Sequence, residues 1–151
     1  MPGYTNRGKF RILKGFFQGL LLPVNFFIAL IDDSIVPTAD TNTMADVSEV
    51  PAGNGYTSGG ISVARDAVDF DVITEDDVND RALVQIKDIV WTGTGGPLPS
   101  GGNGARRSVL TDDNGTVSLR EIISTFDLVS NRLVSAGQTL TLQDAEFRLT
   151  E

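Results

Sequence analysis

The chain has no cysteine and no histidine among its 151 residues. Without cysteine it can form no disulfide framework, and it offers no thiolate as a zinc ligand or nucleophile. Without histidine it lacks the usual general base near neutral pH and the commonest metal ligand. Ser-His-Asp triads, Cys-His pairs and histidine-bearing zinc sites are therefore excluded within this chain. We expect no enzymatic activity, no cofactor and no metal site.

Long apolar runs are also missing. The most apolar stretch, Gly15–Ile31, is shorter than the ~20 residues of a membrane span and is interrupted by a glutamine, a proline and an asparagine. A basic start with an apolar middle is typical of a signal peptide, but no small-residue cleavage site follows Asp32. We therefore prefer a short helix followed by a buried strand over Val24–Ile31, and a membrane or export role stays as the alternative.

Negative charge prevails, with a net charge of −8, but it is unevenly placed. Residues 1–31 hold four bases and no acid, whereas residues 32–80 hold twelve acids against one base. A basic arm on an acidic body suggests binding to an acidic surface, or assembly of the arm onto a neighbouring subunit. The plainer alternative is a solvated N-terminus on an acidic protein.

The N-terminal segment divides into an arm and a helix. Residues 1–8 have no hydrophobic periodicity, and we interpret them as an extended arm that is ordered only if something covers it. A helical spacing follows, which predicts a short helix over Phe10–Leu22 that ends before Pro23. Four apolar residues form one face of it: Phe10, Leu13, Phe17 and Leu20. We assign residues 1–23 to the basic arm and helix, and residues 24–151 to a β-rich domain.

A glycine-rich stretch, Gly53–Gly60, precedes the predicted strand Ile61–Val63. Four glycines in eight residues supply positions for positive φ and close backbone approach. We interpret the stretch as a tight, fixed entry into the strand, and at least one of Gly55, Gly59 and Gly60 should have a positive φ.

The remaining chain shows short alternating patterns separated by turn signals. Val68, Phe70 and Val72 continue the alternation, but at even positions, whereas Ile61 and Val63 are at odd positions. An acidic loop follows over Glu75–Asp80. A glycine- and proline-rich loop is expected over Gly93–Gly104. Further strands are predicted at Ala82–Thr92 with a bulge at Lys87-Asp88, Arg106–Thr111, Glu121–Leu128, Leu133-Val134, Leu140–Leu142 and Phe147–Leu149. These features indicate an all-β fold, a single antiparallel β-sandwich or barrel-like domain with an N-terminal arm and short helix.

Three kinds of chemical site were weighed and set aside. The glycine loops lack the Lys-Ser/Thr of a phosphate-binding P-loop. The segment Asp112–Glu121 partly matches a calcium loop, but Leu110 occupies the first ligand position, so an Asn-Gly turn with solvated acids is preferred. Asp69, Asp71 and the Glu75–Asp77 cluster could pair as glycosidase carboxylates, although solvated acids explain them as well. Trp91 alternates with Ile89 and is expected in the core.

Several segments together resemble a family of small β-rich virion proteins of tailed bacteriophages. The segments are Phe26–Leu30, a Pro/Thr/Asp loop, Gly55-Tyr56 with Gly59-Gly60, Asp88–Thr92 and Val134–Leu142. The resemblance covers roughly residues 24–150 and leaves out the basic arm and helix. Members are labelled capsid decoration, head-fibre or tail-associated proteins, so the resemblance implies a structural role on the virion.

These observations predict a non-enzymatic virion protein, a capsid decoration or cement component that binds and stabilises the major capsid shell. A tail- or fibre-associated protein that positions a receptor-binding element is the alternative. Its partners would be the major capsid protein or neighbouring virion subunits, and we expect a homo-oligomer that binds neither nucleic acid nor membrane. The predicted assembly contacts are Arg7, Lys9, Phe10, Arg11, Leu13, Lys14 and Phe17.

Overall fold

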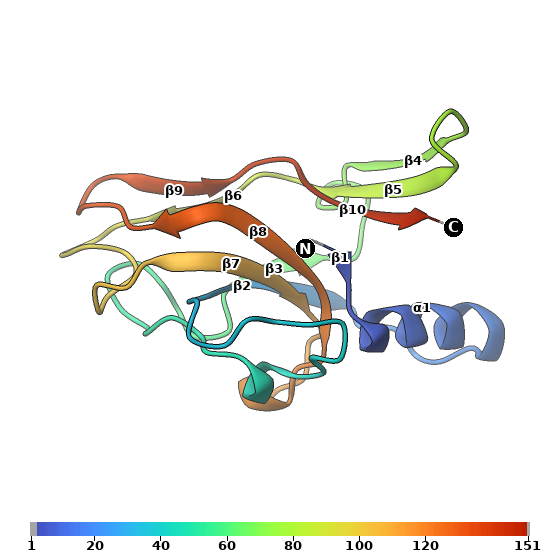
Figure 1. Ribbon diagram of the computed structural model, residues 1–151, viewed down its shortest axis with the longest axis horizontal. Helices are drawn as coiled ribbons and strands as arrows, with labels where there is room; N and C mark the ends of the chain where they lie inside the picture. Colours follow the sequence, from blue (N-terminus) through green and yellow to red (C-terminus); the bar gives the residue numbers. More distant parts are fainter. Residues whose placement is uncertain (1–2, 151) are drawn as a thin grey trace.

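The computed structural model describes residues 3–150, and in this range the chain folds into antiparallel β-sheets with a single α-helix (Figure 1). The first two residues of the predicted arm and Glu151 lie outside the described residues. The elements are β1 (Gly3–Tyr4), α1 (Asn6–Gln18), β2 (Asn25–Ile31), η1 (Met44–Asp46), β3 (Ile61–Ala64), β4 (Val72–Asp76), β5 (Arg81–Ile86), β6 (Ile89–Thr92), β7 (Ala105–Thr111), η2 (Val117–Leu119), β8 (Ile122–Arg132), β9 (Thr139–Leu142) and β10 (Ala145–Thr150). The predicted all-β fold with a short helix is confirmed.

The first layer is a five-stranded sheet in the order β1-β8-β7-β2-β3. The interior strand β2, between β7 and β3, is buried on both faces, because Ile28 and Leu30 point into the main core while Ala29 and Ile31 pack into a second cluster with Met44. The long connection between β2 and β3 supplies Met44 and so covers the outer face of the sheet. This arrangement explains why β2 is a nearly continuous apolar run and not an alternating one.

The second layer is a long antiparallel ribbon with one interruption. β5 pairs with β10 and β6 pairs with β9, and the strand register is the same before and after the break, since Ile86 faces Ala145 and Ile89 faces Leu142. Both Ile86 and Ile89 are buried, so the two residues between them reverse the alternation of the strand. The predicted strand Ala82–Thr92 is therefore interrupted at Lys87-Asp88, where a bulge was predicted, but two residues are unpaired on each strand and the register does not shift, so the break is not a bulge. Trp91, beyond it, lies in the core as predicted.

The glycine stretch is held tightly, as predicted, and Gly55, Gly59 and Gly60 all have positive φ. A Cβ on Gly60 would stand 1.8 Å from the carbonyl oxygen of Ile28. The hydroxyl of Tyr56, which is buried, accepts a hydrogen bond from the N–H of Leu30 at 3.0 Å and donates one to Glu49 at 2.8 Å. Burial is the main cause that raises the pKa of Tyr56, so the hydroxyl stays protonated and can keep donating.

Two predicted elements have different bounds. The helix begins at Asn6 and ends at Gln18, not over Phe10–Leu22, because Thr5 caps its start and Gly19 ends it in the left-handed conformation at φ 66°. Residues 1–8 were expected to form an extended arm. Within the described range, Gly3 and Tyr4 are extended and pair with β8, Thr5 is the extended cap, and the helix already begins at Asn6.

The predicted strand continuation through Val68 and Phe70 is wrong. Residues 65–71 form a turn, since the carboxylate of Asp66 accepts hydrogen bonds from the N–H groups of Val68 and Asp69. Such local bonds compete with a strand ladder. The new strand begins only at β4.

Candidate interaction surface

The first turn of α1 fixes the helix to the sheet. The Thr5 hydroxyl accepts a hydrogen bond from the N–H of Gly8 at 2.9 Å and donates to the carbonyl oxygen of Ile122 in β8. Gly8 lies so close to β8 that a Cβ there would stand 2.1 Å from the carbonyl oxygen of Ile123. Glycine is therefore required for the helix backbone to contact the strand. Tyr4, just before the helix, packs edge-on against Phe147 of β10 with ring centroids 4.9 Å apart.

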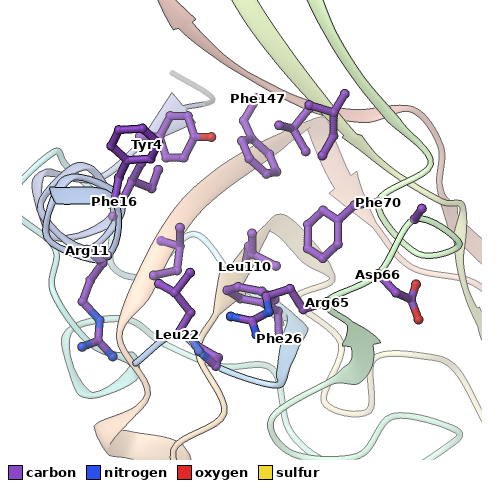
Figure 2. A pocket seen from close by; sticks show the side chains of 18 of the residues that line it. Tyr4, Arg11, Phe16, Leu22, Phe26, Arg65, Asp66, Phe70, Leu110 and Phe147 are labelled. Carbon is purple, nitrogen blue, oxygen red and sulfur yellow. The ribbon is translucent and has the colours of Figure 1, made fainter. Parts of the chain in front are cut away.

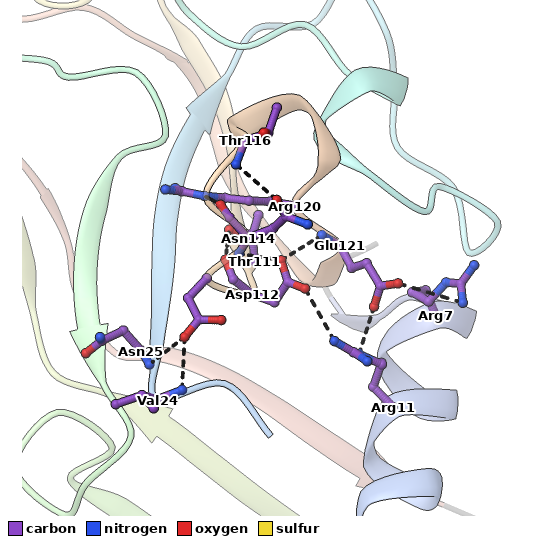
Figure 3. Close-up of polar contacts among 11 residues, drawn as sticks. Arg7, Arg11, Val24, Asn25, Thr111, Asp112, Asn114, Thr116, Arg120 and Glu121 are labelled. Atoms are coloured by element: carbon purple, nitrogen blue, oxygen red, sulfur yellow. Dashed lines mark hydrogen bonds and ion pairs between the residues drawn. The ribbon is translucent and has the colours of Figure 1, made fainter. Parts of the chain in front are cut away.

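Two of the four bases of α1 form ion pairs with the body of the protein (Figure 3). Arg11 Nε lies 2.8 Å from Glu121 Oε2, and its Nη2 lies 3.4 Å from Asp112 Oδ2. Arg7 Nη1 lies 3.9 Å from Glu121 Oε1. No ion pair of Lys9 or Lys14 is found within residues 3–150, so these two charges are available for contacts outside the chain.

Asp112 and Glu121, which lie in the segment that partly matches a calcium loop, are the carboxylates that bind Arg7 and Arg11. Asp112 accepts a hydrogen bond from the N–H of Glu121 at 3.0 Å in addition to its pair with Arg11. Within the described part of the chain, no group of three or more acidic side chains is placed to hold a metal ion. Absence of a calcium site stays a prediction.

The outer side of α1 is apolar and uncovered. Residues in a helix follow one another at about 100°, so Phe10, Leu13 and Phe17 share one face, which we call the outer stripe. These side chains are 48%, 56% and 74% exposed. Lys9 and Lys14 flank the outer stripe on either side. The chain's own sheet contacts the opposite side of the helix, at Gly8, and leaves the outer stripe in solvent.

An apolar groove of about 1000 Å³ lies between the inner side of α1 and the strands β4, β5 and β10 (Figure 2). Residues from eight helices and strands and from two loops line it. Its principal apolar lining residues are Ile12, Phe16, Leu22, Phe26, Phe70, Ile73 and Val84. Phe16 is 84% exposed although it lines the groove, because the groove is open on this side.

The polar groups at the groove do not form a catalytic arrangement. Arg11 is already paired with Glu121, and Asp66 accepts hydrogen bonds from the turn that follows it. Burial raises the pKa of the Tyr4 hydroxyl, which therefore stays neutral and is a poor nucleophile. Arg65 and Asp71 stand at the rim, exposed to solvent. The groove is thus suited to binding apolar groups.

Two of the carboxylates considered for glycoside hydrolysis, Asp69 and Asp76, have a lowered pKa. Asp69 is buried, and the hydrogen bond from Lys87 is the main cause that holds its pKa below the usual range. The pKa of Asp76 is also lowered, chiefly by Asn79 and then by Arg81. A glycosidase general acid needs a raised pKa, so these two groups are tuned in the opposite direction.

The residues predicted as assembly contacts all lie on α1, but not on one face. The outer stripe and its two lysines point away from the body, whereas Arg7 and Arg11 turn toward Glu121. Sequence reasoning missed the groove, whose far wall comes from Phe70, Ile73 and Val84. The adjacent apolar pair Val72-Ile73, which places one apolar side chain on each face of a strand, was the available signal.

Comparison with protein families, with curated proteins and with solved structures finds no match to this chain. In the range that the structure describes, no helix is long and apolar enough to cross a membrane.

Proposed function

We propose that this chain is a non-enzymatic structural subunit of a tailed-bacteriophage virion, a capsid decoration or cement protein that binds the major capsid shell. The single observation that carries a structural, assembly role is the outer stripe of α1. The virion assignment itself is supported by the sequence resemblance over roughly residues 24–150.

An uncovered aromatic stripe is costly unless a partner buries it. Fully burying one leucine or phenylalanine side chain is worth about 1.5–3 kcal/mol. Phe10, Leu13 and Phe17 together could therefore contribute several kcal/mol of binding free energy, from which the cost of association must be subtracted. Phe16 adds a fourth exposed apolar side chain close by, at 5.0 Å between its ring centroid and that of Phe17. Aromatic clusters of this kind are typical centres of protein interfaces.

The charges around the stripe favour an acidic partner surface. Lys9 and Lys14 are unpaired within the described chain, and they lie on either side of the outer stripe. Positive side chains at the edge of an apolar contact speed association with an acidic surface and make it sensitive to salt. The proposed capsid partner would therefore present acidic groups around an apolar pocket.

Point substitutions test this proposal better than removal of the arm. Deleting residues 1–14 would also remove Tyr4, Thr5 and Gly8, which contact β8 and β10, and would damage the fold. Replacing Phe10, Leu13 and Phe17 together by aspartate alters only exposed positions. Leu119→Asp is a matched control, because Leu119 is 57% exposed and lies on η2, away from α1.

The readout is incorporation into phage particles and the number of copies per particle. We expect the control to be incorporated at hundreds of copies and the triple variant to be lost from particles. Normal incorporation of the triple variant would remove the assembly role from α1. A dozen or fewer copies of the unaltered protein would replace the decoration assignment with the tail or fibre alternative, and absence from particles would refute a virion role.

A further inference from the structure

One end of the molecule carries two surfaces that match each other. Helix α1 and the hairpin formed by β4 and β5 both project at this end, on the right of Figure 1, with the apolar groove between them. The helix carries Arg7, Lys9, Arg11 and Lys14 and no acid. The hairpin, residues 72–86, carries Glu75, Asp76, Asp77 and Asp80 against one base, Arg81.

The hairpin is apolar as well as acidic. Val72, Ile73 and Val78 are 36%, 72% and 91% exposed. Asp76 is engaged with Arg81 at 2.7 Å, but no ion pair of Glu75 or Asp77 is found among the described residues. The hairpin thus offers exposed apolar side chains next to unpaired negative charges. The outer stripe of α1 offers exposed apolar side chains next to unpaired positive charges.

We propose that two copies of this chain associate about a two-fold axis, with α1 of each copy lying in the apolar groove of the other. A two-fold interface uses the same patch on both subunits, so the patch must be complementary to itself. A patch with a basic apolar half and an acidic apolar half meets that requirement, because the rotation places each half opposite the other.

The arrangement accounts for both sides of α1. In the dimer, the two helices lie side by side in the middle of the interface, and a hairpin lies on the outside of each. Each helix is thus placed between the helix and the hairpin of the other copy. The outer stripe of each helix then faces the acidic hairpin of the other copy. The groove side of each helix faces the other helix, where Phe16 would be covered. Lys9 and Lys14 come close to Glu75 and Asp77 of the other copy.

A second copy explains the surface better than a small apolar ligand does. A ligand in the groove would cover Phe16 and Ile73, but it would leave the outer stripe and Val78 in solvent. It would also leave the four unpaired charges without a role. This inference concerns the protein in solution and does not depend on the virion assignment. Both inferences use the outer stripe, so a copy that binds the shell through the stripe cannot at the same time form this dimer. Reversal of the hairpin charges leaves the stripe unaltered, so it should abolish the dimer without preventing incorporation into particles, and the two inferences can fail separately.

The test uses two charge-reversed variants of the full chain. The first carries Lys9→Glu and Lys14→Glu, and the second carries Glu75→Lys and Asp77→Lys. Neither pair of changes disrupts an ion pair of the described chain. Mass in solution is measured by sedimentation or light scattering over a range of protein concentrations, at low and high salt, with circular dichroism and melting as the check on folding.

We expect the unaltered protein to be a dimer that weakens with salt. Each variant alone should dissociate at least about tenfold more readily, which corresponds to about 1.4 kcal/mol, because like charges then face each other. An equimolar mixture of the two variants should restore a dimer, because the reversed helix of one meets the reversed hairpin of the other. Recovery on mixing also shows that neither variant had simply unfolded.

Four outcomes would overturn the proposal. The first is an unaltered protein that stays monomeric at all concentrations, with or without a bound apolar ligand. The second is a dimer that the hairpin reversal leaves unchanged, which would indicate helix–helix contact only. The third is a mass that grows beyond the dimer with concentration, which would indicate head-to-tail association. The fourth is a mixture of folded variants that stays monomeric.

Discussion

The glycine stretch around Tyr56 and the helix α1 differ in whether their side chains have partners within the chain. Around Tyr56, in the stretch Gly53–Gly60, the chain is irregular, but hydrogen bonds of several of its polar groups fix it to the rest of the fold, and we call this part the closed region. The glycine stretch is held by Glu49, which accepts hydrogen bonds from Tyr56, Ser58 and the N–H of Gly59. Around α1 the backbone is regular, but the outer stripe stays largely exposed, at 48% for Phe10, 56% for Leu13 and 74% for Phe17, and we call this part the open region. A regular backbone thus does not mean that the side chains of a region have partners within the chain. The contacts of the side chains have to be compared directly.

Arg120 illustrates the closed region. Its Nη1 donates to the carbonyl oxygen of Gly59 and its Nε to that of Asn114, both at 3.0 Å. The guanidinium carbon lies 3.7 Å from the centroid of the Phe27 ring. One buried cation therefore connects the glycine stretch, the β7–β8 turn and β2. On the outer stripe, by contrast, the basic side chains that approach belong to the helix itself: the guanidinium carbon of Arg7 and Nζ of Lys14 lie 5.8 Å and 5.3 Å from the centroid of the Phe10 ring.

The largest expected effect on stability comes from Gly60→Val, because Gly60 makes the closest backbone contact of the glycine stretch. Positive φ alone costs a branched residue about 1–3 kcal/mol, and the added Cβ would also collide with the carbonyl oxygen of Ile28. We expect a loss of more than about 3 kcal/mol in the free energy of unfolding, or failure to fold. Thermal or denaturant unfolding measures it.

Gly115→Val is the matched control for this change. Gly115 lies in the β7–β8 turn, has no positive φ and would meet no atom within 4 Å. We expect a small change there, within about 0.5 kcal/mol. If Gly60→Val melts like the control, the glycine stretch is a slack linker and the comparison between the two regions fails.

A smaller effect is expected from Tyr56→Phe, which removes one hydroxyl from the closed region. The N–H of Leu30 would lose its acceptor in a buried place, and Glu49 would lose a donor. An unsatisfied buried group costs about 1–3 kcal/mol. Denaturant unfolding should show a loss of that size in the free energy of unfolding, with no change in its dependence on denaturant concentration.

Tyr4→Phe isolates the effect of the hydrogen bonds. Tyr4 is also largely buried, but no hydrogen bond of its hydroxyl is found in the described chain. Its loss of a hydroxyl should therefore change the stability little. Equal losses from Tyr4→Phe and Tyr56→Phe would show that ring burial, and not the hydrogen-bonding of Tyr56, holds the closed region.

The two regions also differ in how well the sequence predicted them. The strands and the break at Lys87-Asp88 could be predicted because they follow from neighbouring residues: the alternation of apolar and polar side chains, and the turn residues between the strands. The positive φ of Gly60 follows from the same kind of pattern. The turn after Arg65 was missed because the carboxylate of Asp66 caps it, and this hydrogen bond outweighs the β alternation of Val68 and Phe70.

The site on α1 could be predicted only in part. The apolar periodicity correctly placed Phe10, Leu13 and Phe17 on one face, but wrongly included Leu20, which lies beyond the end of the helix at Gln18. Periodicity also does not say which face a helix buries. Gly8 decides that, because this residue without a side chain approaches the backbone of β8, and a sequence offers no signal for this close approach. The groove joins segments far apart in the chain, so it depends on the tertiary fold alone.

The smallest expected effect comes from Phe17→Ser, and it is the one that defines the open region. Phe17 is 74% exposed, and serine and phenylalanine have similar helix propensities. We expect the stability of the isolated chain to change by less than about 0.5 kcal/mol, measured on protein diluted until it is monomeric. Gly8→Ala on the same helix is the contrast. Alanine normally stabilises a helix, yet here its Cβ would meet the carbonyl oxygen of Ile123, so this change should destabilise the chain. A loss from Phe17→Ser as large as that from Gly8→Ala would mean that the chain itself covers the outer stripe, and the helix would then have no open side left for a partner.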